Sequence, residues 1–78
     1  LRNKKHAYSV VTRGNSLGYA LRNQRWRYAR WPDGEELYNL TNDPSEKNNL
    51  AGETRHEHRL KEFRTLLNEK QRHAKSAR

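Results

Sequence analysis

Apolar and polar residues alternate with a period of two along the first half of the chain. Residues 6–13 (HAYSVVTR) place Tyr8 and Val10 on one face of an extended segment and Val11 on the other. Short strand-like runs that each contain an aromatic residue also occupy 19–22, 25–31 and 36–40. This pattern predicts four β-strands.

Turn-forming residues separate the four runs. The predicted connections are a loop over 14–18, a two-residue hairpin joint at 23–24 and a tight turn over 32–34. All three are short enough for consecutive strands to pair as hairpins. We therefore expect an antiparallel meander.

The apolar period changes to three and four residues toward the C-terminal end. Leu60, Phe63 and Leu67 form one apolar stripe, which is typical of a helix that packs on a sheet. Thr54 and Glu57 have the spacing of a capping box, so the helix is predicted to begin at Thr54.

A single helical turn is expected between the last strand and this helix. Asp43 can accept a hydrogen bond at the cap, Pro44 needs no N–H there, and Glu46 would lie near the positive helix end. This turn would end near Asn48 and Asn49, and Asn49 and Leu50 would anchor it to the sheet.

The fold class predicted from these elements is α+β, a four-stranded antiparallel sheet packed by one C-terminal helix. We assign this unit to residues 6–70. Residues 1–5 are interpreted as the stub of a longer chain. The apolar stripe stops near Lys70, so the basic residues 71–78 are interpreted as a frayed tail.

The predicted strands carry large apolar residues on both faces, although one helix can cover only one. Adjacent or odd-spaced pairs point to opposite sides of the sheet: Val10 and Val11, Tyr28 and Trp31, Leu37 and Tyr38. Exposed aromatic patches are typical of interfaces. We therefore expect the second face to dock on a larger body or to bind a ligand.

Composition limits the class of protein. Seventy-eight residues, of which 31% are hydrophobic, can form one small domain with a thin core. There is no cysteine, which excludes a disulfide and a cysteine-based zinc site. No apolar run approaches the roughly 20 residues that span a membrane, so no membrane partner is expected.

The net charge of +8 is unevenly distributed. Residues 1–31 contain no acid, whereas residues 32–54 contain six acids and a single base, Lys47. A uniformly basic nucleic-acid arm would not usually carry such an acidic middle, and nucleic acid is not the expected partner.

The basic stretch 22–31 (RNQRWRYARW) permits two interpretations. Its arginines and aromatic residues could form a stacking platform that binds nucleic acid or a sulfated polysaccharide. Alternatively, the aromatic residues belong to the core and the arginines to a solvated face. A free-standing polyanion-binding module that uses this stretch is our alternative function.

Residues that carry chemistry are sparse. The four histidines (His6, His56, His58 and His73) lack partners at ligand spacing, so no metal site is expected. Residues 39–41 form a glycosylation sequon. We see no phosphate-binding glycine loop, nucleophile triad or pair of buried carboxylates, and we assign no catalytic residue to this chain.

Three segments, taken together and in order, are similar to a known family. They are AYSVVTRG (7–14), GYALRNQRWRYARW (18–31) and GEELYNLTNDPSEKNNLAG (34–52). Over residues 7–67 the chain resembles the C-terminal subdomain of the type I, formylglycine-dependent sulfatases of the alkaline phosphatase superfamily, and most of all the iduronate-2-sulfatase-like group.

The resemblance implies that the parent protein hydrolyses sulfate esters, such as a sulfated saccharide, with a formylglycine and a calcium ion. Both belong to the family's larger N-terminal domain, which this chain lacks, so no cofactor is expected here. The chain would be a scaffold and cleft wall, inactive alone, with that catalytic domain as its partner. The family's compartments are periplasmic, secreted or lysosomal.

Arg13 is the one candidate site residue, and it would bind substrate. Its simpler interpretation is a structural arginine that pairs with a carboxylate of a neighbouring domain. The alternative is that its planar guanidinium lines the mouth of the cleft and holds a sulfate or uronate group. The chain departs from the family pattern beside it: Val10 replaces a glutamine, and Val11 and Thr12 replace an aromatic residue and a proline.

Overall fold

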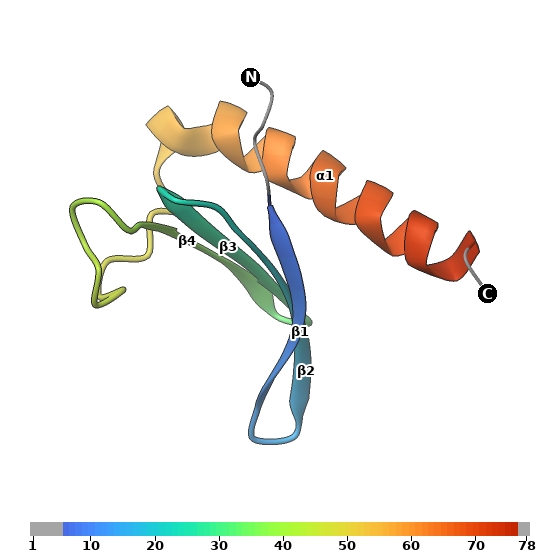
Figure 1. Ribbon diagram of the computed structural model, residues 1–78. Helices are drawn as coiled ribbons and strands as arrows, with labels where there is room; N and C mark the ends of the chain where they lie inside the picture. The colour runs from blue at the N-terminus through green and yellow to red at the C-terminus, as the bar shows by residue number, and fades with distance from the viewer. Residues whose placement is uncertain (1–5, 77–78) are drawn as a thin grey trace.

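The structure, a computed structural model, describes residues 6–76 and has the predicted α+β architecture. Four strands form one antiparallel sheet in the order β1-β2-β3-β4, and a long helix lies across one face (Figure 1). The elements are β1 (Ala7–Arg13), β2 (Ser16–Arg22), β3 (Trp26–Trp31), β4 (Gly34–Asn39), a 3₁₀ turn η1 (Thr54–His56) and α1 (Glu57–Ser76).

The first connection is shorter than predicted. Strand β2 begins at Ser16, which pairs with Arg13, so only Gly14 and Asn15 form the turn. Gly14 has φ of +60°, a conformation that glycine adopts at little cost, and a glycine at this position favours a tight hairpin whose twist matches the strands. The predicted loop over 14–18 was therefore wrong beyond Asn15.

The second connection is one residue longer than the predicted two-residue joint. Asn23, Gln24 and Arg25 lie between β2 and β3. The Asn23 side-chain oxygen accepts hydrogen bonds from the backbone N–H groups of Arg25 and Trp26, both at 2.8 Å. This Asx-type turn replaces the glycine that a two-residue loop would favour. In the third connection Gly34 already belongs to β4, opposite Trp31.

No helical turn forms at residues 43–49, so that prediction was wrong. The Asp43 carboxylate instead accepts hydrogen bonds from the backbone N–H groups of Lys47 and Asn48, at 3.0 and 2.9 Å. Glu46 has φ of +56°, a left-handed conformation that cannot continue a right-handed helix.

Asn49 and Leu50 fasten this segment to β4, as predicted. The Asn49 side chain accepts a hydrogen bond from the Leu37 N–H at 3.0 Å and donates to the Glu35 carbonyl at 3.2 Å. The Leu50 N–H donates to the Leu37 carbonyl at 2.8 Å.

The predicted capping box does not form. Residues 54–56 are a 3₁₀ turn without a side-chain cap, and α1 begins at Glu57. The Glu57 carboxylate accepts a hydrogen bond from Arg64 at 3.2 Å, an interaction along the helix that removes it from a capping role. Helix α1 continues to Ser76, and fraying of 71–78 stays a prediction.

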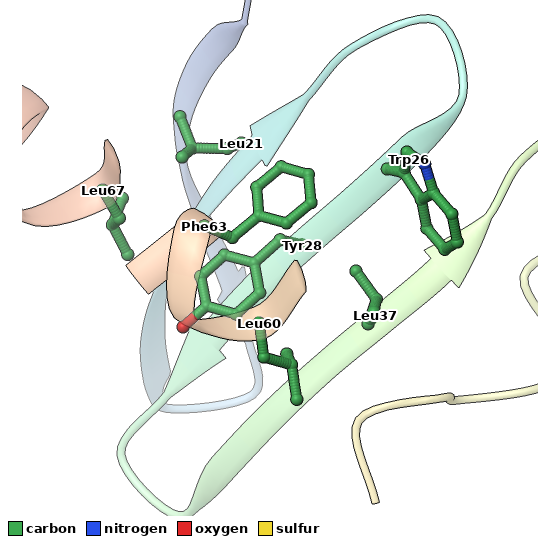
Figure 2. Close-up of a cluster of buried hydrophobic side chains, with 7 residues drawn as sticks. All are labelled: Leu21, Trp26, Tyr28, Leu37, Leu60, Phe63 and Leu67. Atoms are coloured by element: carbon green, nitrogen blue, oxygen red, sulfur yellow. The ribbon is translucent and has the colours of Figure 1, made fainter. Parts of the chain in front are cut away.

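The main core lies between α1 and the sheet. Figure 2 shows the helix residues facing strands β2, β3 and β4. The rings of Phe63 and Tyr28 are stacked, with their centroids 5.5 Å apart. The buried members are the predicted helix stripe and one face of β2 to β4: Leu21, Trp26, Tyr28, Leu37, Leu60, Phe63 and Leu67. The helix stripe was therefore confirmed.

A polar clamp fixes the helix over this core. The Glu35 carboxylate accepts hydrogen bonds from the Tyr28 hydroxyl at 2.7 Å and from Arg64 Nε and Nη2 at 2.6 and 2.7 Å. Arg64 lowers the pKa of the Glu35 carboxyl, and burial raises the pKa of the Tyr28 hydroxyl. The clamp joins β3, β4 and α1 at one point.

Candidate functional site

Arg13, the predicted site residue, lies at the end of β1 on the sheet face opposite the helix. Its guanidinium carbon lies 4.3 Å from the ring centroid of Trp31. Nη1 donates to Glu36 Oε2 at 2.8 Å, and Nη2 lies 3.4 Å from Oε1. The guanidinium is thus held flat by an indole on one side and a carboxylate at its edge, while 62% of its side chain stays exposed.

The electrostatics of this cluster follow from the ion pair. The hydrogen bond from Arg13 holds the pKa of the Glu36 carboxyl below its ordinary value, and the same contact raises the pKa of the guanidinium. Burial, and then the charge of Glu36, raise the pKa of the Tyr38 hydroxyl. Near neutral pH the cluster therefore presents a charged guanidinium, a carboxylate and a neutral phenol.

Gly18 makes room for the indole that supports Arg13. A Cβ atom at this position would lie 2.6 to 2.8 Å from three ring carbons of Trp31, so only glycine admits this close approach. Ala20 and Ala29 are buried in the same small cluster, and Val11 packs against it. These small residues form a shallow seat for the ring.

The seat corrects the expectation of an exposed aromatic patch on this face. Trp31 is only 8% exposed although no helix covers it. The partner of Arg13 also differs from the expected carboxylate of a neighbouring domain, because Glu36 of the same chain supplies it. The strand ends explain this: in a four-stranded meander the end of β1 and the start of β4 lie at the same end of the sheet.

The arginine-rich strand does not form a stacking platform. Trp26 and Tyr28 are buried in the main core and Trp31 in its seat on the other face. Arg27 pairs with Glu46 at 3.1 Å, and Arg30 donates to the side-chain oxygens of Asn68 and Gln71. The structure therefore matches the second interpretation, in which the aromatic residues are core.

A second arginine–tryptophan stack lies at the other end of β3. The guanidinium carbon of Arg59 lies 4.2 Å from the ring centroid of Trp26, on the helix side of the sheet. A hollow of about 570 Å³ beside it is lined by Asn23, Phe63 and Leu66 among others. It is far from Arg13, because Trp26 and Trp31 occupy opposite ends and opposite faces of one strand.

The three histidines whose side chains are described contact different partners. His56 packs edge-on against Trp26 at 5.7 Å, His58 lies 3.3 Å from a carboxylate oxygen of Glu62, and His6 packs edge-on against Phe63 at 5.8 Å. His73, the fourth histidine considered above as a metal ligand, lies outside the residues whose side chains are described. Within the described residues, no three His, Cys, Asp or Glu side chains are grouped as a metal site would need. No described helix is long and apolar enough to cross a membrane.

Exposed apolar side chains gather at the tip of the β1–β2 hairpin, which the sequence pattern did not single out. Strand β3 pairs with β2 only from Tyr19 onward, so the hairpin extends beyond the rest of the sheet (Figure 1). Val10 is 54% and Leu17 is 46% exposed, and both lie on the same face as half-buried Tyr19. We call these three residues the hairpin patch.

Comparison with known proteins gives structural matches that include two sulfatase structures. No protein-family model and no curated protein matches the chain. A 2-O GAG sulfatase matches with 31% sequence identity and a TM-score of 0.75, over 96% of this chain and 18% of its own. A candidate sulfatase from Bacteroides thetaiotaomicron VPI-5482 matches with 32% identity and a TM-score of 0.68, over 88% of this chain and 17% of its own.

These matches agree with the resemblance seen in the sequence motifs, at a coarser level. They extend over nearly the whole of this chain, but the chain spans less than a fifth of the length of either structure. In both sequence and fold, this chain resembles a small part of sulfatase structures.

Proposed function

We propose that this chain is the C-terminal subdomain of a sulfatase, a sulfuric ester hydrolase of the iduronate-2-sulfatase-like group. The observation that carries the proposal is the match over 96% of this chain to a portion of a 2-O GAG sulfatase. The order of the three sequence motifs supports the position at the C-terminal end. A sulfate ester of a saccharide is the corresponding substrate of the parent.

The proposal assigns the chemistry to residues outside this chain. The described residues contain no group of three His, Cys, Asp or Glu side chains that could hold a calcium ion, and the chain contains neither a Cys-x-Pro-x-Arg nor a Ser-x-Pro-x-Arg sequence that could supply formylglycine. Calcium and formylglycine would therefore belong to the catalytic domain. The role left for this chain is to support that domain and to form part of the cleft wall.

Arg13 is the residue we propose for contact with substrate. Its guanidinium is exposed, charged and held in one orientation by Trp31 and Glu36, which reduces the entropy lost when it binds an anion. Glu36 already accepts from both Nη atoms, so the remaining N–H groups would contact the substrate. A sulfate or uronate carboxylate has the matching charge and geometry.

The test uses the natural polypeptide that contains this chain. We expect its reading frame to encode a Cys-x-Pro-x-Arg or Ser-x-Pro-x-Arg motif before Leu1, and the purified protein to release sulfate from an aryl sulfate or a 2-O-sulfated uronate disaccharide. The 78-residue chain alone should release none. A reading frame without the motif, or turnover by the chain alone, would contradict the proposal.

Two matched variants test the role of Arg13. Arg13→Lys keeps the charge but loses the planar fork, so we expect a higher KM for the disaccharide with little change in kcat. Arg25→Lys makes the same exchange at an exposed residue at the other end of the sheet and should leave both constants unchanged. Equal KM values for both variants would assign Arg13 a structural role only.

A further inference from the structure

The hollow beside the stacked Trp26 and Arg59 has the size and lining of a small-molecule site. Its volume is about 570 Å³, and such sites typically measure about 300–1,000 Å³. Trp26, Phe63 and Leu66 give it apolar walls. It lies at the end of the sheet away from Arg13 and the hairpin patch, because Trp26 follows the β2–β3 turn. We call it the Arg59 hollow.

Arg59 brings to this hollow a cation that no described side chain neutralises. Its guanidinium is stacked on Trp26, its Nε atom is buried without a hydrogen-bond partner, and it forms no ion pair with the side chains that the structure describes. The other half-buried arginines among the described residues all donate to side-chain oxygens: Arg27, Arg30 and Arg64. Buried polar groups are nearly always paired, and an unpaired one is costly. An acceptor bound in the hollow would give this guanidinium the partner it lacks.

The charges around the hollow also favour an anion. Lys61 lines it as a second cation beside Arg59. The carboxylate in the lining belongs to Glu62, and one of its oxygens lies 3.3 Å from Nε2 of His58. Two permanent cations therefore outweigh one carboxylate, and the local potential attracts a negatively charged group.

We propose that the Arg59 hollow binds an organic anion, an apolar ring that carries one carboxylate, sulfonate or sulfate group. The ring would contact Phe63 and Leu66, and the anionic group would accept hydrogen bonds from the guanidinium of Arg59. Trp26 holds this guanidinium flat before the ligand arrives, which reduces the entropy lost on binding. The site lies on the helix side of the sheet and goes beyond the proposed function, on which it does not depend.

Titration calorimetry of the natural full-length protein tests the proposal. The probe is 2-naphthoate, which joins an apolar ring system to one carboxylate. Its neutral analogue 2-naphthamide has nearly the same shape without the charge. We expect saturable binding of the naphthoate and at least tenfold weaker binding of the amide, because the amide cannot neutralise Arg59.

Three variants assign this binding to the hollow. Arg59→Gln removes the cation, and Thr65→Glu adds a carboxylate at an exposed position of the lining. Both should raise the Kd for naphthoate at least tenfold. Arg72→Gln is the matched control, because it removes the same charge from an exposed position of α1 about 20 Å along the helix, and it should leave the Kd unchanged.

Thermal unfolding of each variant shows whether it is folded. If loss of the stack on Trp26 unfolds Arg59→Gln, the exposed change Thr65→Glu decides the question. The inference would be overturned by the absence of saturable naphthoate binding, by equal binding of the amide, or by a Kd that Thr65→Glu leaves unchanged. An equal loss of affinity in Arg72→Gln would also overturn it, because the effect would then come from net charge alone.

Discussion

Gly18→Ala should destabilise the chain through the single methyl group that it adds. The new Cβ would lie 2.6 Å from Cε3 of Trp31, whereas carbon atoms in contact are normally about 3.5 to 4.0 Å apart. The indole must then move by about 1 Å, but it is 92% buried and seated on Ala20 and Ala29 under the guanidinium of Arg13. Overpacking of this kind costs about 1–3 kcal/mol.

For a domain of this size, a loss of about 2 kcal/mol lowers the thermal midpoint by roughly 8–16 °C. Circular dichroism of the chain on heating measures this shift. Gly52→Ala is the matched control, because a Cβ there meets no atom within 4 Å. Trp31→Leu combined with Gly18→Ala should lose less than the sum of the two single changes, since they share one contact. A midpoint equal to that of Gly52→Ala would refute the close-packing argument.

Other predictions concern the clamp, the core and the connection to β4. The pKa of the Glu35 carboxyl is lowered in the folded state, so the carboxylate stabilises the fold above its ordinary pKa of about 4.3, and this contribution is lost as the pH falls through the lowered value. In Glu35→Gln the free energy of unfolding should therefore decrease less on acidification than in the unchanged chain. Urea unfolding at several pH values measures this difference. Phe63→Ala should lower the free energy of unfolding by about 3–5 kcal/mol because the ring is buried. Glu62→Ala, at an exposed position of the same helix, should lower it little, and thermal unfolding compares the two variants. Asn49→Ala leaves the Leu37 N–H without its acceptor and should lower the free energy of unfolding by about 1–3 kcal/mol. The control Asn48→Ala should lower it little, and hydrogen exchange at the Leu37 amide measures the difference.

The sequence pattern predicted the strands and the helix stripe because both depend on local periodicity. The alternation of Tyr28 and Trp31 across β3 correctly placed these rings on opposite faces. The helix stripe at three- and four-residue spacing gave the buried face of α1. To predict these features, one needs only the residue period of a strand or a helix and the positions of the apolar residues.

The side-chain roles depended on contacts between distant residues, which periodicity does not contain. Glu57 had the spacing of a capping partner, but Arg64 two turns along the helix binds it instead. Glu36 is 23 residues from Arg13 and pairs with it only because the meander brings the two strand ends together. The shielding of Trp31 by Gly18 and Arg13 likewise required the register of β1 and β2.

The fastening of residues 49–50 to β4 also limits how the sheet can grow. An outer strand with unpaired N–H and C=O groups is a template for strand addition and aggregation. On β4 the outward N–H and C=O of Leu37 and the C=O of Glu35 are already bonded to Asn49 and Leu50. Among the described strands, β1 is therefore the one left to accept a further strand, so edge-to-edge association between chains would join β1 to β1 and form one continuous eight-stranded sheet at most.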